Sequence, residues 1–140
     1  MFGTKHPRAA LLKTSPMFKG CTDRELESIA TITDDLELPA GHVLAREGAT
    51  GFECFVILDG EASVTIGGVE VARLGEGDLV GEMSIIDGGR RSATVVARTP
   101  MYVVVLTRAA FGTLLSDYPA VARRVLATLS GRLRALLPAS

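Results

Sequence analysis

The chain has 140 residues, of which 47% are hydrophobic, so it can bury the core of one domain and is too apolar for a disordered protein. Its 15 basic and 16 acidic side chains leave a formal charge of −1, which excludes the basic face of a nucleic-acid-binding protein but allows a local anion site around one arginine. No apolar run approaches the length of a membrane span, and the first residues do not have the pattern of a signal peptide. We therefore expect a cytoplasmic protein without membrane contact, in which Cys21 and Cys54 are reduced thiols.

The N-terminal part of the sequence predicts helices. Residues 8–14 are predicted to form one or two helical turns. Thr22 and Glu25 have the spacing of a capping box, in which each side chain bonds the backbone N–H of the other residue. Apolar residues then follow at helical spacing, so a helix is predicted over residues 22–31.

The middle of the chain predicts short strands. Glycines recur at short, regular intervals from Gly41 onward and separate runs rich in Val, Ile and Leu, a pattern typical of an antiparallel sandwich or jelly roll. Gly67 and Gly68 suit a tight hairpin turn. The predicted strands cover residues 43–45, 54–58, 62–66, 69–74, 94–97 and 101–106.

The C-terminal part returns to helical spacing, with helices predicted over residues 108–116 and 120–137. The last helix carries an apolar seam made of Leu126, Leu129, Leu133 and Leu136. This seam either packs on the protein's own strands or pairs with a second copy in a homodimer. The predicted fold is therefore mainly β, an antiparallel β-roll or jelly roll flanked by N-terminal helices and two C-terminal helices, in one domain over residues 1–140.

One segment, residues 81–94, departs from the strand pattern. It joins a short helical turn, opened by Gly81, through a glycine-rich link to Arg90 and Arg91. A helix start presents free N–H groups to an anion, and an arginine adds charge-assisted hydrogen bonds to phosphate oxygens. Glu82 is out of place beside a phosphate unless the ligand also offers a hydroxyl donor, as a ribose does. An anion, a hydroxyl and an apolar wall together describe a nucleotide.

This segment resembles the phosphate-binding cassette of cyclic-nucleotide-binding domains, the module shared by catabolite-activator proteins, cyclic-nucleotide-dependent kinases and cyclic-nucleotide-gated channels. The resemblance extends over residues 15–137. It implies a sensor that binds cyclic AMP, ahead of cyclic GMP, with no catalytic residue, metal or cofactor. The motifs that carry it outside the cassette are Pro-Met-Phe at 16–18, Pro-Ala-Gly at 39–41, Arg-Glu-Gly at 46–48, Phe-Val-Ile-Leu-Asp-Gly-Glu at 55–61 and Leu-Gly-Glu-Gly-Asp at 74–78.

The resemblance also implies a role for individual residues. Gly81 would let the backbone approach the ribose, Glu82 would accept the ribose 2′-hydroxyl, and Arg91 rather than Arg90 would pair with the cyclic phosphate. The base would be capped from the last helix, by Arg132 or by Leu136. The other implied ligand-binding groups are Val71 and Ala72 in the apolar wall, the N–H groups near Met83, Ser84 and Ile85, the Ser92 hydroxyl and the Ala93 N–H.

Three other interpretations stay open. In the first, Glu82 is a structural partner of Arg91 in an empty, vestigial pocket, and the chain is a protein–protein interaction module. His6 and His42 admit a metal-dependent cupin, although two isolated histidines do not build a metal site. A DNA-binding output is not expected because no DNA-reading element follows the last helix before Ser140, so the sensor is expected to signal to an effector protein of unknown identity.

Overall fold

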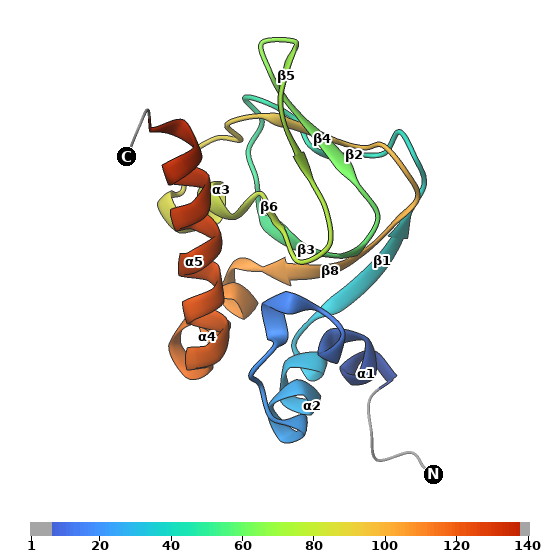
Figure 1. Ribbon diagram of the computed structural model, residues 1–140, viewed down its shortest axis with the longest axis vertical. Helices are drawn as coiled ribbons and strands as arrows, with labels where there is room; N and C mark the ends of the chain where they lie inside the picture. The colour runs from blue at the N-terminus through green and yellow to red at the C-terminus, as the bar shows by residue number, and fades with distance from the viewer. Residues whose placement is uncertain (1–6, 138–140) are drawn as a thin grey trace.

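Two four-stranded antiparallel sheets face each other in the computed structural model, which describes residues 7–137. Helices from both ends of the chain lie below one of the sheets, and the last helix runs upward along the side of the roll (Figure 1). The predicted class, a mainly β roll flanked by N-terminal and C-terminal helices, is confirmed. None of the helices within the described part of the chain is long and apolar enough to cross a membrane.

The strands follow the prediction closely. The first sheet has the order β1 (Asp34–Leu38), β8 (Met101–Thr107), β3 (Glu53–Asp59) and β6 (Leu79–Val80). The second has the order β2 (Val43–Ala45), β7 (Thr94–Ala97), β4 (Ala62–Ile66) and β5 (Val69–Leu74). The hairpin between β4 and β5 turns at Gly67 and Gly68, as predicted. Strands β1 and β6 were not predicted, the first because three of its five residues are acidic and the second because it is two residues long.

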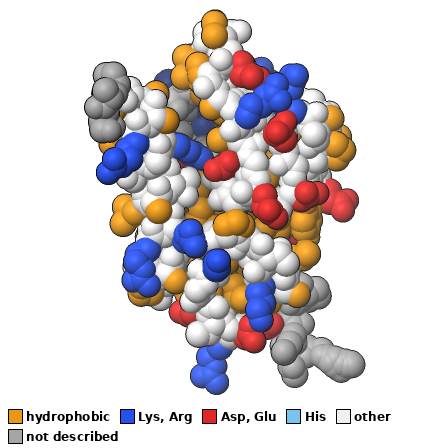
Figure 2. Space-filling model, in the orientation of Figure 1, with side chains coloured by type: hydrophobic (Ala, Val, Ile, Leu, Met, Phe, Trp, Pro, Cys, Tyr) orange, Lys and Arg blue, Asp and Glu red, His pale blue; other side chains and the backbone are white. Residues whose placement is uncertain are grey.

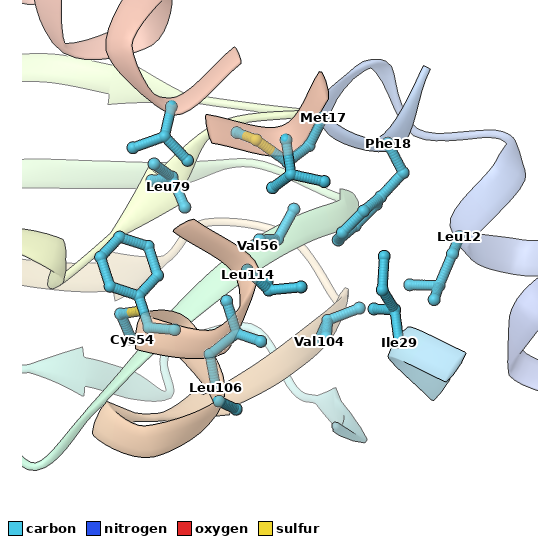
Figure 3. Packing of buried hydrophobic residues seen from close by; sticks show 14 of the residues in the cluster. Leu12, Met17, Phe18, Ile29, Cys54, Val56, Leu79, Val104, Leu106 and Leu114 are labelled. Carbon is cyan, nitrogen blue, oxygen red and sulfur yellow. The ribbon is translucent and has the colours of Figure 1, made fainter. Parts of the chain in front are cut away.

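Strands β3 and β8 are buried on both faces, which explains their uninterrupted apolar sequences. Cys54 and Val56 of β3 face the helices, whereas Phe55 and Ile57 face the interior of the roll. Figure 3 shows the helix-side cluster, where strand residues such as Val104 meet side chains of the N-terminal and C-terminal helices. The first sheet is thus a shared wall between the helices and the roll.

The N-terminal helices are α1 (Pro7–Lys13), the 3-10 helix η1 (Pro16–Phe18) and α2 (Asp23–Thr31). The predicted capping box is present: the Glu25 N–H donates to Thr22 Oγ1 at 3.1 Å, and the Thr22 N–H donates to Glu25 Oε1 at 2.8 Å. Because Thr22 is the N-cap, α2 begins at Asp23, one residue later than predicted.

Arg8, Asp35 and Tyr102 form a hydrogen-bonded polar cluster, called the clasp below, that joins these helices to the first sheet. Arg8 of α1 donates to Asp35 Oδ1 at 2.6 Å and to the Ala30 carbonyl of α2 at 2.6 Å. The Tyr102 hydroxyl of β8 donates to the other oxygen of Asp35, and this hydrogen bond, with burial second, raises the pKa of Tyr102 to about 12. One carboxylate on β1 therefore links a helix to the neighbouring strand.

The remaining helices are α3 (Glu82–Asp87), α4 (Arg108–Asp117) and α5 (Pro119–Leu136). Helix α5 packs on the core through Val121 and Val125, with Leu129 partly buried beside them. The other leucines of the predicted seam are largely exposed, at 66% for Leu126, 59% for Leu133 and 81% for Leu136. The interpretation that this seam packs on the protein's own strands is therefore wrong except for Leu129, because the buried face of α5 lies to one side of the seam.

Candidate functional site

A cavity of about 220 Å³ opens between the second sheet, strand β6 and helices α3 and α5. All of the side chains predicted to bind the ligand line it, apart from Val71 and the alternative base cap Leu136. The lining residues are Ala45, Val64, Ile66, Ala72, Leu74, Leu79, Val80, Gly81, Glu82, Met83, Ser84, Arg91, Ser92, Ala93, Val95 and Arg132. The cavity is apolar on its sheet side and polar where α3, the Arg91 segment and α5 meet.

Val71 was predicted to form part of the apolar wall, but the structure places it outside the cavity. It is 55% exposed on β5, whereas Ala72 and Leu74 of the same strand line the cavity. The β4–β5 pairing passes from Val64–Ala72 to Thr65–Glu70, so Val71 is the extra residue of an irregularity, and its side chain lies outside the cavity. The apolar wall on this strand consists of Ala72 and Leu74.

Gly81 is the N-cap of α3, and its backbone conformation determines how the chain enters this helix. Its φ angle of 81° lies in the left-handed region, which favours glycine. A Cβ at this position would lie 2.2 Å from Nη1 of Arg91, so a side chain would collide with the guanidinium as well. The first backbone N–H groups of a helix have no acceptor inside it, and the first three residues of α3, Glu82, Met83 and Ser84, line the cavity.

Arg91 brings a buried positive charge to this cavity. Its side chain enters between two backbone segments, donating from Nη1 to the Gly81 carbonyl at 2.9 Å and from Nη2 to the Glu53 carbonyl at 2.7 Å. The residue is only 8% exposed, and no carboxylate in residues 7–137 forms an ion pair with it. Its neighbour Arg90 is exposed and donates to the Gly48 carbonyl at 3.0 Å. Of the two adjacent arginines, Arg91 is the one inside, in agreement with the spacing that the resemblance implied.

Glu82 brings a buried negative charge, and Arg132 of α5 compensates it. Glu82 is 3% exposed, and its Oε1 accepts a hydrogen bond from Arg132 Nη1 at 2.8 Å. The same guanidinium donates from Nη2 to the Leu79 carbonyl. Oε2 of Glu82 has no hydrogen-bond partner within the described part of the chain. The cavity therefore holds a carboxylate oxygen that is free to accept from a ligand hydroxyl.

Arg132 lies at the cavity, whereas Leu136, the other candidate for capping a base, is 81% exposed and does not line it. Sequence reasoning considered Arg132 only as a cap and missed its ion pair with Glu82. A signal was available, because Arg132 follows the buried Val125 by seven residues, or two helical turns, and so shares its face of α5.

A thiol lies close enough to this buried polar pair to sense its charges. The pKa of Cys54 is raised to about 12, first by burial and then by the negative charge of Glu82, while the positive charge of Arg91 lowers it. Cys54 therefore carries no charge at neutral pH, and the polar chemistry of the site rests on Glu82, Arg91 and the N–H groups of α3. Such a set can hold an anionic group and a hydroxyl side by side against an apolar wall.

Comparisons with known proteins agree with this geometry. The model of the family described as "Cyclic nucleotide-binding domain" matches residues 35–118. The chain is 32% identical over 128 residues to the "Cyclic AMP receptor protein" of Thermus thermophilus, covering 88% of this chain and 59% of that protein. It is 32% identical over 117 residues to a "cAMP-dependent protein kinase regulatory subunit" of Emericella nidulans, covering 82% of this chain and 28% of the subunit. A solved structure of a variant cAMP-binding acyltransferase from Mycobacterium smegmatis has a TM-score of 0.80 at 31% identity, covering 91% of this chain and 41% of that one.

The chain therefore spans less than two thirds of the length of each of these relatives. The family match decides against the cupin alternative, for which His42 is exposed and His6 lies outside the described residues. The matched region extends from the second residue of β1 to the end of α4 and contains all of the cassette, in the fold that the resemblance implied. The chain belongs to the cyclic nucleotide-binding domain family.

Proposed function

We propose that this domain is a sensor that binds a cyclic nucleotide, cyclic AMP in preference to cyclic GMP, and that it has no catalytic activity of its own. The observation that carries the proposal is the presence of Arg91 and Glu82 in one cavity, the first without an ion-pair partner within residues 7–137 and the second with a free oxygen. A cyclic nucleotide offers a phosphate to the one and a ribose hydroxyl to the other. We further propose that residues 1–140 form one domain, and a cytoplasmic location remains a prediction of the sequence.

The donors of Arg91 support the phosphate contact. A guanidinium has five N–H donors, and two of the donors of Arg91 are used by the carbonyls of Gly81 and Glu53. The remaining donors are free for phosphate oxygens, and the fork shape of the guanidinium suits two of them at once. Met83, Ser84, Ser92 and Ala93 line the same cavity, and we propose that the Ser92 hydroxyl and the N–H groups of the other three add hydrogen bonds to the phosphate.

Cyclic AMP is preferred because the three relatives reported above carry cyclic AMP in their names. Those names also show that similar domains serve a receptor protein, a kinase regulatory subunit and an acyltransferase. The effector of this domain is accordingly a protein whose identity the family does not fix. We propose that the domain regulates it without touching DNA or membrane.

The relay would run through α5. Arg132 of this helix holds the carboxylate that is proposed to receive the ribose, so the position of α5 and the occupancy of the cavity depend on each other. A ligand that binds one arrangement of α4 and α5 more tightly shifts the population toward that arrangement. The proposed output is a new packing of α4 and α5 against the roll.

Calorimetric titration with cyclic AMP and, in parallel, cyclic GMP tests the proposal. We expect saturable binding of cyclic AMP and weaker binding of cyclic GMP. A thermal melt supplies the second readout, because a ligand at about 100 times its dissociation constant stabilises the folded state by about 2.7 kcal/mol. The proposal would be overturned if neither nucleotide produced binding heat or a shift in melting temperature.

The second candidate is an interaction module with a vestigial pocket, and the exposure of Leu126, Leu133 and Leu136 favours it. These three side chains, with Leu129 at their inner edge, would pair with a second copy of α5 in a homodimer. Sedimentation velocity over a range of protein concentrations tests this pairing. A species that stays monomeric at all concentrations contradicts the homodimer, and a Leu126→Glu/Leu133→Glu variant is the control for a dimer made elsewhere.

A further inference from the structure

A second concavity, of about 390 Å³, lies between the loop after η1 and the first half of α5. We name it the Lys19–Arg124 groove. It shares no lining residue with the nucleotide cavity. It is lined by Lys19, Gly20, Ala120, Arg123, Arg124 and Ala127. Four of these residues belong to α5, at positions 120, 123, 124 and 127. This helical spacing places them on one side of the helix, away from Leu126 and Leu133.

The groove is strongly cationic in a protein that is not basic. Lys19, Arg123 and Arg124 are exposed at its rim, and no lining residue is acidic. None of these three cations forms an ion pair with a carboxylate in the described part of the chain, whereas Arg73 and Arg132 do. Helix α5 contains no Asp or Glu at all. Because the whole chain has a formal charge of −1, this local excess does not follow from its composition.

The floor of the groove is narrow. A Cβ at Gly20 would lie 3.5 Å from the Ala120 Cβ, so the loop and the helix approach each other closely there. Lys and Arg side chains gather over the lower part of α5 and the adjoining N-terminal segment in the space-filling view (Figure 2). Small side chains at the bottom and long cations at the rim leave room for an extended chain with carboxylates directed at the rim.

The size of the groove distinguishes a peptide from a single ion. A liquid water molecule takes roughly 30 Å³, so a space of about 390 Å³ is much larger than one inorganic anion fills. Three cations from two separate elements also suit several carboxylates better than one phosphate. We propose that the Lys19–Arg124 groove docks an acidic peptide segment of a partner protein. The proposal does not depend on the nucleotide.

The rim contacts are solvent-exposed, so docking is expected to be modest in affinity and sensitive to salt. The probe is a fluorescein-labelled ten-residue peptide of alternating Glu and Gly, and binding is read by fluorescence anisotropy. We expect saturable binding at low salt that weakens as salt is added. A peptide of alternating Gln and Gly is expected not to bind.

Three variants locate the binding. Arg123→Glu/Arg124→Glu is expected to weaken binding at least about tenfold, since both contacts become repulsive. Arg46→Glu/Arg98→Glu changes the net charge equally at exposed arginines of the roll and is expected to keep the parent affinity. Ala127→Trp fills the groove without changing any charge and is expected to weaken binding too. Thermal melts of all three variants check that each is folded.

Three results would overturn the proposal. The first is no saturable binding of the acidic peptide to the parent chain. The second is an equal loss in Arg46→Glu/Arg98→Glu, which would make the attraction a general effect of net charge. The third is unchanged binding by folded Ala127→Trp, which would place the peptide outside the groove.

Discussion

Arg132 and Glu82 lie 50 residues apart in the chain, and their side chains meet at 2.8 Å inside the nucleotide cavity. The carboxylate is 3% exposed, whereas the arginine side chain retains 34% of its exposure. This is a partly buried ion pair whose acidic member has left water almost entirely. It is also the direct polar link between α5 and the cassette, so it bears on stability and on ligand binding together.

Removing this arginine should destabilise the fold. Arg132→Ala leaves Glu82 buried without its partner, which we expect to cost about 1–3 kcal/mol in the free energy of unfolding. Urea denaturation measures it. Arg134→Ala, two residues along α5 and exposed, is the matched control and should stay within about 0.5 kcal/mol of the parent. Adding Glu82→Gln to Arg132→Ala should recover part of the loss, and no recovery would contradict the pairing as its cause.

Removing the other cavity arginine should abolish tight nucleotide binding. Arg91→Ala leaves the bound phosphate without its buried cation, at a cost of about 2–5 kcal/mol, or a loss of about thirty- to several-thousand-fold in affinity. Calorimetric titration with cyclic AMP measures it. Arg90→Ala, which removes an exposed neighbour of equal charge, should bind like the parent. Equal affinities for Arg91→Ala and the parent would remove Arg91 from the site.

Substitution by tryptophan should weaken ligand binding at Ala72 of β5 but not at its neighbour Val71. Ala72 lines the cavity and Val71 does not, so Ala72→Trp should fill the space against the ligand and weaken cyclic AMP binding at least about tenfold. Val71→Trp should leave binding unchanged. Both residues are exposed on an edge strand, so melting temperatures should change little in either variant. A loss of binding in Val71→Trp but not in Ala72→Trp would mean that Val71, and not Ala72, faces the ligand.

The buried thiol should make stability fall at alkaline pH. Cys54 ionises near its ordinary pKa of 9.0 in the unfolded chain, whereas in the folded chain burial raises its pKa to about 12. Between these values the unfolded state holds fewer protons than the folded state, so stability decreases as pH rises. Urea denaturation at several pH values in this window measures the slope. Cys54→Ala should show a shallower slope than the parent, and identical slopes would contradict an ionisation confined to the unfolded chain.

The clasp on the first sheet should contribute to holding the N-terminal helices. Tyr102→Phe deletes the hydroxyl that donates to Asp35, and we expect a loss of about 1 kcal/mol in the free energy of unfolding. Tyr118→Phe is the control, because no hydrogen bond of its hydroxyl joins it to another described residue. Thermal denaturation compares the two variants. A loss in Tyr118→Phe as large as that in Tyr102→Phe would mean that ring packing, and not the hydrogen bond, is responsible.

The sequence predicted the fold well because its signals are local. The turn glycines and short apolar runs mark six of the strands, and the capping box of Thr22 and Glu25 marks α2. Strand β1 was missed because Asp34, Asp35 and Glu37 give it a polar sequence, and its place is fixed only by pairing with β8.

The residues that line the cavity were predicted where they belong to one contiguous segment and were missed where a distant segment contributes. Gly81, Glu82 and Arg91 lie within one short stretch, so their spacing is readable from the chain. The partner of Glu82 comes from a helix 50 residues away. Val71 was assigned to the wall by the resemblance, which does not show the irregularity of the β4–β5 pairing at this residue, where Val64 pairs with Ala72 and Thr65 with Glu70.

The guanidinium of Arg91 is seated by two positions that have no side chain. A Cβ at Gly51 would lie 2.4 Å from its Cζ, and one at Gly81 would lie 2.2 Å from its Nη1. An alanine at either position would meet the arginine before it met a ligand, so weaker binding in such a variant would report a displaced arginine rather than a lost contact. An alanine scan restricted to side chains around the ligand would leave both positions out. The space that the Arg91 guanidinium occupies thus depends on two glycines, thirty residues apart in the chain, that have no side chain to fill it.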